Sequence, residues 1–198
     1  MSRVVVCTSL TLDGVMQAPG RADEDTRGGF AYGGWAAPYA AMVEAGEYFA
    51  SAGSLLFGRR TYEDFYSVWP ARKDSPFTPF LDNIRKYVAS TTLKEPLPWS
   101  NSTLLDGDAA GAVAGLRTEP GKDILILGSG KLVQSLMRQN LVDVYVLLIH
   151  PLVLGSGRRL FADGGAFAKL RLTGSRTTST GVVIATYEPV EHAAAQPA

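Results

Sequence analysis

The chain has 198 residues, of which 46% are hydrophobic and 19% are charged, a balance that is typical of a soluble globular protein with a sizeable core. Its 19 basic and 19 acidic residues cancel and form no basic stripe, so nucleic acid is not an expected partner. A single cysteine, Cys7, excludes an intrachain disulfide, and with only two histidines no metal-ligand spacing is present. No apolar run approaches the ~20 residues of a membrane span, so we expect a cytoplasmic protein without a membrane partner.

Apolar segments alternate between strand-like and helix-like spacing, which indicates an α/β fold. Apolar runs predict strands over 3–10, 54–57, 86–90, 103–105, 124–127 and 142–153. Helical spacing predicts helices over 39–52, 62–68, 80–84, 109–118 and from residue 132 onward. Two alternating segments flank Thr180-Gly181 and predict a C-terminal antiparallel hairpin over 169–179 and 181–188. We expect one domain over residues 1–190 and a disordered tail over 191–198.

A long loop runs from Met16 to Pro38. Loops of this length inside a compact domain are usually functional lids, so we expect this one to be mobile without ligand and to order over a filled pocket. Its aromatic residues, Phe30, Tyr32 and Trp35, either line such a pocket or cover an edge of the core. The sequence leaves both alternatives open.

The most informative stretch is the junction between a buried strand and a helix at Gly128-Ser129-Gly130. Free backbone N–H groups and the helix dipole face such a turn, and glycine lets a phosphate approach the backbone closely. The turn is not a P-loop, because Leu132 stands where Ser or Thr is required, and Val133 replaces the third glycine of a dinucleotide fingerprint. We interpret it as a site for the diphosphate of a nucleotide; the alternative is a plain strand-to-helix turn.

A second strand-to-helix junction, Gly58-Arg59-Arg60-Thr61, carries two arginines. Arginine forks suit phosphate geometry, although a pair of surface arginines in a solvated turn is common. Ser90 and Thr91 follow another strand, where hydroxyls face the ligand crevice of an open α/β sheet.

Five short segments in this order resemble the dihydrofolate reductase-like superfamily, in the branch that includes the C-terminal reductase domain of bacterial riboflavin-biosynthesis enzymes (RibD). They span 9–14, 58–63, 88–91, 127–132 and 151–157. The resemblance implies a mixed sheet of about eight strands flanked by helices, with NADPH lying across the strand ends. It also implies a homodimer, which we expect in addition because the apolar strands near 144–148 and 182–185 would need cover at their edges.

The resemblance also implies roles for single residues. Arg59 is expected to bind the adenosine 2′-phosphate, with Arg60 as the competing candidate, and Thr61 to lie beside the diphosphate. Ser90 and Thr91 are expected near the adenosine. The remaining cofactor-binding residues are the two turns themselves, Gly58, Gly128, Ser129, Gly130, Lys131 and Leu132.

The substrate side is less defined. Asp13 is a candidate polar contact or proton relay, and its alternative is a turn-forming Asp-Gly. Trp35, Tyr39 and Phe49 are the expected substrate contacts. Alignment on Trp35 places Ala40 where dihydrofolate reductases carry the acidic residue that holds the pterin, so folate is not the expected substrate.

We therefore predict an NADPH-dependent reductase of a small heterocyclic substrate. One alternative is the riboflavin-pathway 5-amino-6-(5-phosphoribosylamino)uracil reductase. The other is a nucleotide-binding module without turnover.

Overall fold

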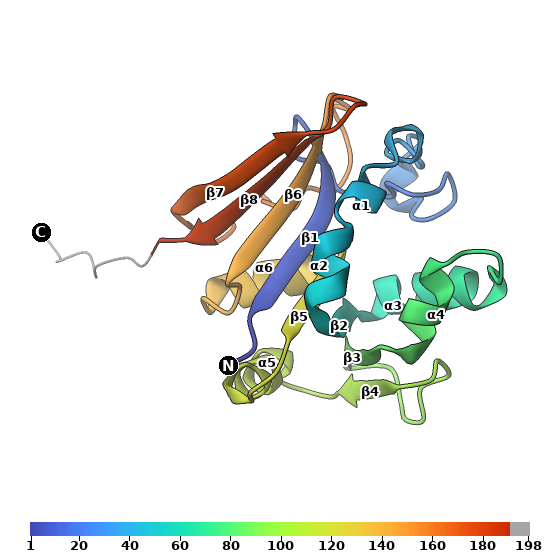
Figure 1. Cartoon of the computed structure of the whole chain (residues 1–198), viewed down its shortest axis with the longest axis vertical. Coiled ribbons are helices and arrows are strands. Elements are labelled where there is room, and N and C mark those ends of the chain that lie inside the picture. The colour runs from blue at the N-terminus through green and yellow to red at the C-terminus, as the bar shows by residue number, and fades with distance from the viewer. Residues whose placement is uncertain (191–198) are drawn as a thin grey trace, which may run out of the picture.

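A computed structural model describes residues 1–190; the predicted tail over 191–198 lies outside the described residues. Eight strands form one sheet in the order β4-β3-β2-β5-β1-β6-β8-β7 (Figure 1). The strands are β1 (Val4–Thr11), β2 (Ala52–Gly58), β3 (Arg85–Ala89), β4 (Ser102–Leu105), β5 (Asp123–Leu127), β6 (Val144–His150), β7 (Leu170–Thr177) and β8 (Val183–Pro189).

The six strands from β1 to β6 run parallel, whereas β8 pairs antiparallel with both β6 and β7. The predicted mixed sheet of about eight strands and its C-terminal antiparallel hairpin are therefore confirmed. The strand edges differ from the expectation, because β6 lies between β1 and β8, and β8 lies between β6 and β7. The apolar strands thus have no free edge. This reason for a homodimer is wrong, although the homodimer itself stays a prediction.

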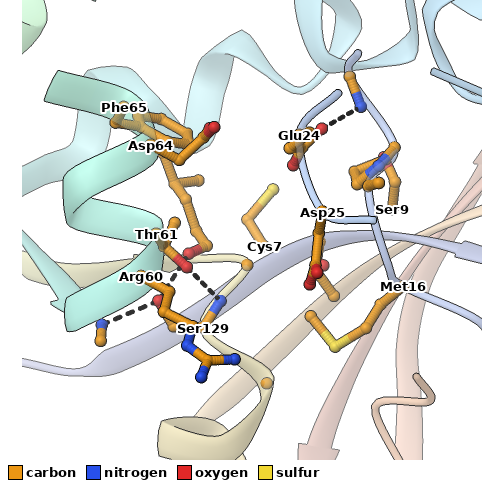
Figure 2. Close-up of a pocket in the computed structure, with 18 of the residues that line it drawn as sticks. Cys7, Ser9, Met16, Glu24, Asp25, Arg60, Thr61, Asp64, Phe65 and Ser129 are labelled. Atoms are coloured by element: carbon orange, nitrogen blue, oxygen red, sulfur yellow. Dashed lines mark hydrogen bonds between the residues drawn. The ribbon is translucent and has the colours of Figure 1, made fainter. Parts of the chain in front are cut away.

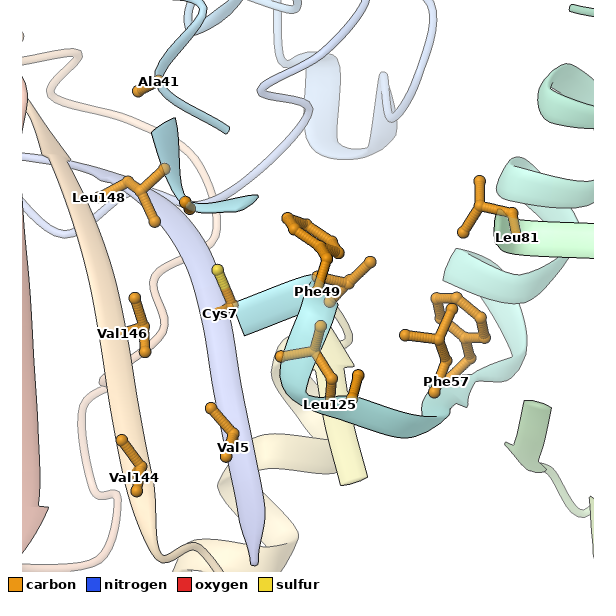
Figure 3. Close-up of a cluster of buried hydrophobic side chains, with 14 of the residues drawn as sticks. Val5, Cys7, Ala41, Phe49, Phe57, Leu81, Leu125, Val144, Val146 and Leu148 are labelled. Carbon is orange, nitrogen blue, oxygen red and sulfur yellow. The ribbon is translucent and has the colours of Figure 1, made fainter. Parts of the chain in front are cut away.

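Helices cover both faces of the sheet and enclose two apolar cores (Figure 1). One face carries α1 (Ala41–Glu44), α2 (Gly46–Ser51), α3 (Arg59–Val68) and α4 (Phe77–Asn83). The other carries α5 (Ala109–Thr118) and α6 (Gly130–Arg138). Figure 3 shows the first core, where side chains of β1, β5 and β6 face Phe49 of α2. None of the helices within residues 1–190 is long and apolar enough to cross a bilayer.

The predicted helix over 39–52 is wrong. A short 3-10 helix (Ala37–Tyr39) comes first, and Ala40 then adopts a left-handed φ of 49°, which separates it from α1. A second break falls at Ala45, before Gly46, a poor helix former. Strand β2 already begins at Ala52, because that residue pairs with Asp123 of β5.

The bounds of other helices and strands also differ from those predicted from the sequence. Helix α4 begins at Phe77, after Pro76, rather than at Phe80. Strand β6 ends at His150 rather than at residue 153, because Pro151 has no N–H to donate to a neighbouring strand.

The long loop has a small core of its own, formed by Val15, Ala18, Phe30 and Trp35. Trp35 is only 8% exposed, and its Nε1 donates to the carbonyl of Gln17 at 2.7 Å. Tyr32, by contrast, is 52% exposed. Of the two alternatives for the loop's aromatic residues, the structure supports core formation for Phe30 and Trp35.

Candidate active-site cleft

A cleft of ≈ 2060 Å³ opens at the carboxyl ends of β1, β2 and β5. Its floor includes Cys7 of β1, and its walls are α3 on one side and the first part of the long loop, from Met16 to Arg27, on the other (Figure 2). Small-molecule pockets occupy about 300–1,000 Å³. The cleft therefore has room for two ligands side by side.

The two glycine junctions lie next to each other in this cleft, because β2 and β5 are paired in parallel. The backbone N–H of Gly58 donates to Ser129 Oγ at 3.0 Å, and the N–H of Ser129 donates to Thr61 Oγ1 at 3.2 Å (Figure 2). Ser129 Oγ in turn donates to the carbonyl of Leu127 at 3.1 Å. Ser129 thus fixes one turn against the other. We call these two junctions, with the residues they present to the cleft, the glycine half.

Neither helix that starts in the glycine half has a side-chain cap. The N-cap residues Gly58 of α3 and Ser129 of α6 accept no hydrogen bond from their own helix through a side chain. Helices α1, α2 and α4 also lack such a cap, whereas in α5 Asp108 accepts from the N–H groups of Ala110 and Gly111. The two termini of the glycine half differ from the others in opening together into the cleft. The first backbone N–H groups of a helix need an external partner. At α3 and α6 a ligand in the cleft can supply it.

The conformation of the second turn explains its glycines. Gly128 has a left-handed φ of 56°, and Ser129 follows with 53°. At Gly130 the reason is space rather than φ: a Cβ atom there would lie 2.6 Å from Met16 Sδ. Met16, on the long loop, therefore covers this turn directly.

Cations surround the glycine half. Arg59, Arg60 and Lys131 line the cleft. The ion pair of Arg59 with Glu63 is long, at 4.0 Å, and both side chains are more than 40% exposed (41% and 48%), so the guanidinium can turn toward a ligand. Ser90 Oγ accepts from the N–H groups of Thr92 and Leu93.

The other part of the cleft has an aromatic wall. Five aromatic residues of α2, α3, the 3-10 helix Trp69–Ala71 and α4 line it, and we call them the aromatic half: Phe49, Phe65, Trp69, Phe77 and Phe80. Their rings form a continuous series, with centroids 5.0 Å apart for Phe49 and Phe77, 5.3 Å for Trp69 and Phe77, and 6.2 Å for Phe65 and Trp69.

Acidic groups and the thiol of Cys7 complete this part of the site. Figure 2 places Glu24 across the cleft from Asp64 and Phe65 of α3, with Cys7 between them. Burial raises the pKa of Glu24, even though its Oε2 accepts from the N–H groups of Gly20 and Arg21. Burial also raises the pKa of Cys7 to about 12, so its thiol stays protonated at neutral pH.

The cleft collects most of the residues expected from the sequence. Its lining includes Phe49 and all ten expected cofactor residues, namely Gly58, Arg59, Thr61, Ser90, Thr91, Gly128, Ser129, Gly130, Lys131 and Leu132. Three others, Asp13, Trp35 and Tyr39, are not part of the lining.

Each of these three has another contact. The Asp13 carboxylate accepts from Thr11 Oγ1 at 2.6 Å and from the N–H groups of Leu154 and Gly155 at 3.2 and 2.9 Å. The hydrogen bond from Thr11 is the main cause that lowers the pKa of Asp13, so the group stays ionised and supports the turn-forming interpretation. The rings of Trp35 and Tyr39 pack edge-on against His150, with centroids 5.1 and 5.2 Å away.

Sequence reasoning missed several lining residues. It assigned Cys7 to the core and did not single out Met16, Glu24 or Asp64. It also overlooked the aromatic half apart from Phe49. One signal was available, because four of its five rings fall within 65–80, around a proline-containing loop.

Comparisons with known proteins agree with this architecture. A family model described as the RibD C-terminal domain matches residues 2–184. The uncharacterized protein YyaP of Bacillus subtilis strain 168 is 31% identical over 139 residues, which is 68% of this chain and 72% of YyaP.

Two solved structures are similar over 96% of the chain. A Shewanella sp. PV-4 protein provisionally assigned to riboflavin biosynthesis has a TM-score of 0.69 at 20% identity and is covered completely (100%). Dihydrofolate reductase from Enterococcus faecalis, solved with NADP(H), has a TM-score of 0.59 at 10% identity, with 97% of it covered. The fold is therefore dihydrofolate reductase-like, as the sequence predicted.

Proposed function

Because the chain belongs to the RibD C-terminal domain family, we propose that it is an NADPH-dependent reductase of a small heterocyclic substrate. The observation that carries the proposal is the pair of uncapped helix N-termini in the glycine half, tied together by Ser129 and facing one cleft. Two such termini at the ends of adjacent parallel strands suit the two phosphates of a dinucleotide.

The residues present fit NADPH. The left-handed Gly128 allows a diphosphate to approach the backbone of this turn closely, and Lys131 adds a cation. At Gly130 the side chain of Met16 has to move aside for such an approach. Arg59 is the candidate for the 2′-phosphate, because its guanidinium is exposed and only loosely paired. Ser90 and Thr91, at the next strand end, are the candidates for the adenosine.

When bound, the reduced nicotinamide supplies the hydride. The chain's own residues position it and keep water out. Cys7 forms a floor that is neutral at physiological pH because burial raises its pKa to about 12. Met16 covers the turn at Gly130, so the first part of the long loop shields the expected diphosphate from water.

The test is to titrate NADPH and NADH against the wild type, Arg59→Ala and Arg60→Ala. A hydrogen bond to a charged group contributes roughly 1.5–3 kcal/mol. At about 1.4 kcal/mol per decade, Arg59→Ala should weaken NADPH binding about ten- to a hundredfold and leave NADH nearly unchanged. If Arg59→Ala weakens both cofactors equally, Arg59 does not bind the 2′-phosphate.

The family match favours a second candidate, the riboflavin-pathway 5-amino-6-(5-phosphoribosylamino)uracil reductase. Product analysis with that pyrimidine and NADPH separates the two. Tight NADPH binding with no oxidation across a panel of ring substrates would instead support a binding module. The predicted homodimer is independent of these alternatives, and light scattering at micromolar concentration tests it.

A further inference from the structure

We propose that the aromatic half of the cleft binds a flat, uncharged ring compound that carries no phosphate. This inference rests on the proposed function, because it assigns the glycine half to the cofactor and only the aromatic half to the substrate.

The first support is the continuity of the aromatic surface. Phe49 meets Phe77 with its ring plane turned by 88°, and Trp69 meets Phe77 at 71°, so the rings pack edge to face. All three line the cleft, although they also pack against the core. A core-supported aromatic wall is rigid. It offers stacking and edge contacts to a planar ligand, and it offers no hydrogen bonds to a polar chain.

The second support is the charge of this half. Glu24 and Asp64 face each other across it, and the charge of Asp64 is one of the causes that raise the pKa of Glu24. Because Arg21 already pairs with Asp64, the carboxylate that would repel a phosphate in this partly buried site is that of Glu24.

The third support is that the cations nearby already have partners. Arg21 forms a two-pronged ion pair with Asp64, with Nη2–Oδ1 and Nη1–Oδ2 distances of 2.6 and 3.3 Å. Arg72 is stacked above Trp69, with its Cζ atom 5.2 Å from the ring centroid. A phosphorylated ligand would have to compete with Asp64 for Arg21, whereas an uncharged ring would leave this ion pair intact.

The test uses a matched pair of probes, 2-naphthol and 2-naphthyl phosphate, which share one bicyclic ring. Calorimetric titrations are run at neutral pH with NADP⁺ saturating, so that the glycine half is filled. We expect 2-naphthol to bind at least about tenfold more tightly than its phosphate ester, a difference of about 1.4 kcal/mol. Equal or tighter binding of the phosphate ester, or no binding of 2-naphthol, overturns the proposal.

Two neighbouring residues of α3 provide matched variants. Phe65 lines the cleft, whereas Tyr66 points away from it and packs on Tyr62 and Trp99. Phe65→Leu keeps an apolar side chain but removes the ring, so 2-naphthol binding should weaken about tenfold, as for the loss of one stacking ring. Tyr66→Leu should leave it unchanged. An equal loss in both variants contradicts a role of the ring in binding.

The experiment also separates this proposal from the proposed function. NADP⁺ binding is measured first, and its failure rejects the reductase. If NADP⁺ binds normally to the wild type and to Phe65→Leu while the phosphate ester binds better than 2-naphthol, the cofactor assignment stands and only the substrate class is wrong.

Discussion

The two halves of the cleft offer a ligand different kinds of contact. The glycine half presents backbone: uncapped helix N-termini, three glycines and a serine that ties one turn to the other. The aromatic half presents side chains from four separate segments. Backbone recognition needs particular residues at fixed spacing in one short stretch, while a side-chain wall needs only ring shape at positions that the fold brings together.

The two halves should therefore tolerate amino-acid substitutions to different degrees. At Gly128 the left-handed φ disfavours any side chain, whereas at Gly130 an added Cβ would meet only the flexible side chain of Met16. The aromatic half can exchange one large apolar residue for another at modest cost.

The largest expected effect concerns Cys7, which lies where the two halves meet. Because burial raises its pKa to about 12, about one thiol in ten thousand is ionised at about pH 8, against about a quarter for a free thiol of pKa about 8.5. Alkylation by iodoacetamide should therefore be about a thousandfold slower than in the unfolded chain. The rate should rise about tenfold per pH unit well beyond pH 9, where a free thiol levels off.

Cys7 is the chain's only cysteine, so mass spectrometry assigns the label without ambiguity. Cys7→Ser is the unreactive control. Alkylation of the native protein at the rate of the unfolded chain would contradict a dry floor between the halves.

The next largest effect tests the glycine half alone. Gly130→Val places a branched side chain where Met16 Sδ lies, beside the expected diphosphate. Losing two hydrogen bonds to a charged group should weaken NADPH binding at least a hundredfold, at roughly 1.5–3 kcal/mol each. Gly115→Val, at a helical glycine whose added Cβ meets nothing within 4 Å, is the matched control.

Adding Met16→Ala separates two causes. If the double variant recovers binding, the valine acted by displacing Met16. If it does not, the side chain blocks the cofactor itself. A folded Gly130→Val protein that binds NADPH normally would exclude this turn as the diphosphate site.

The contrast between short local motifs and side chains brought together by the fold also explains how much of the structure the sequence could predict. Strand-to-helix order and the alternating segments around Thr180-Gly181 are local features, so the α/β class and the C-terminal hairpin followed from them. The mixed sheet of about eight strands was implied by the family resemblance, and the contact between the two turns was not predicted. Helix boundaries near Ala40 and Ala45 did not, because a left-handed alanine and a single break in an apolar stretch leave no strong sequence signal.

The substrate side was harder to predict for a physical reason. Trp35 and Phe30 are aromatic residues in a loop, and nothing local distinguishes packing against Val15 from lining a cleft. The carboxylate of Asp13 accepts hydrogen bonds from the N–H groups of Leu154 and Gly155, which lie far from it in sequence. The sequence alone could not show that this candidate proton relay already has these partners. Long-range hydrogen bonds of this kind decide whether a polar residue is free to act.

The smallest expected effect concerns the link between the long loop and the aromatic half. Arg21 and Asp64 join the loop to α3, and their side chains are only 26% and 21% exposed. Such a pair contributes on the order of 1 kcal/mol. Arg21→Ala should therefore speed hydrogen exchange of residues 19–26 about fivefold and weaken 2-naphthol binding to a similar degree, with little change for NADPH.

Residues 30–36 should exchange as before, because Trp35 holds them through Gln17 and the small core. Arg171→Ala, which removes an exposed ion pair with Glu188 on β8, should alter neither segment. Faster exchange across the whole range 16–38 would show that the loop opens as one body. The lid would then cover both halves of the cleft equally, and the link at Arg21 would no longer distinguish the substrate side from the cofactor side.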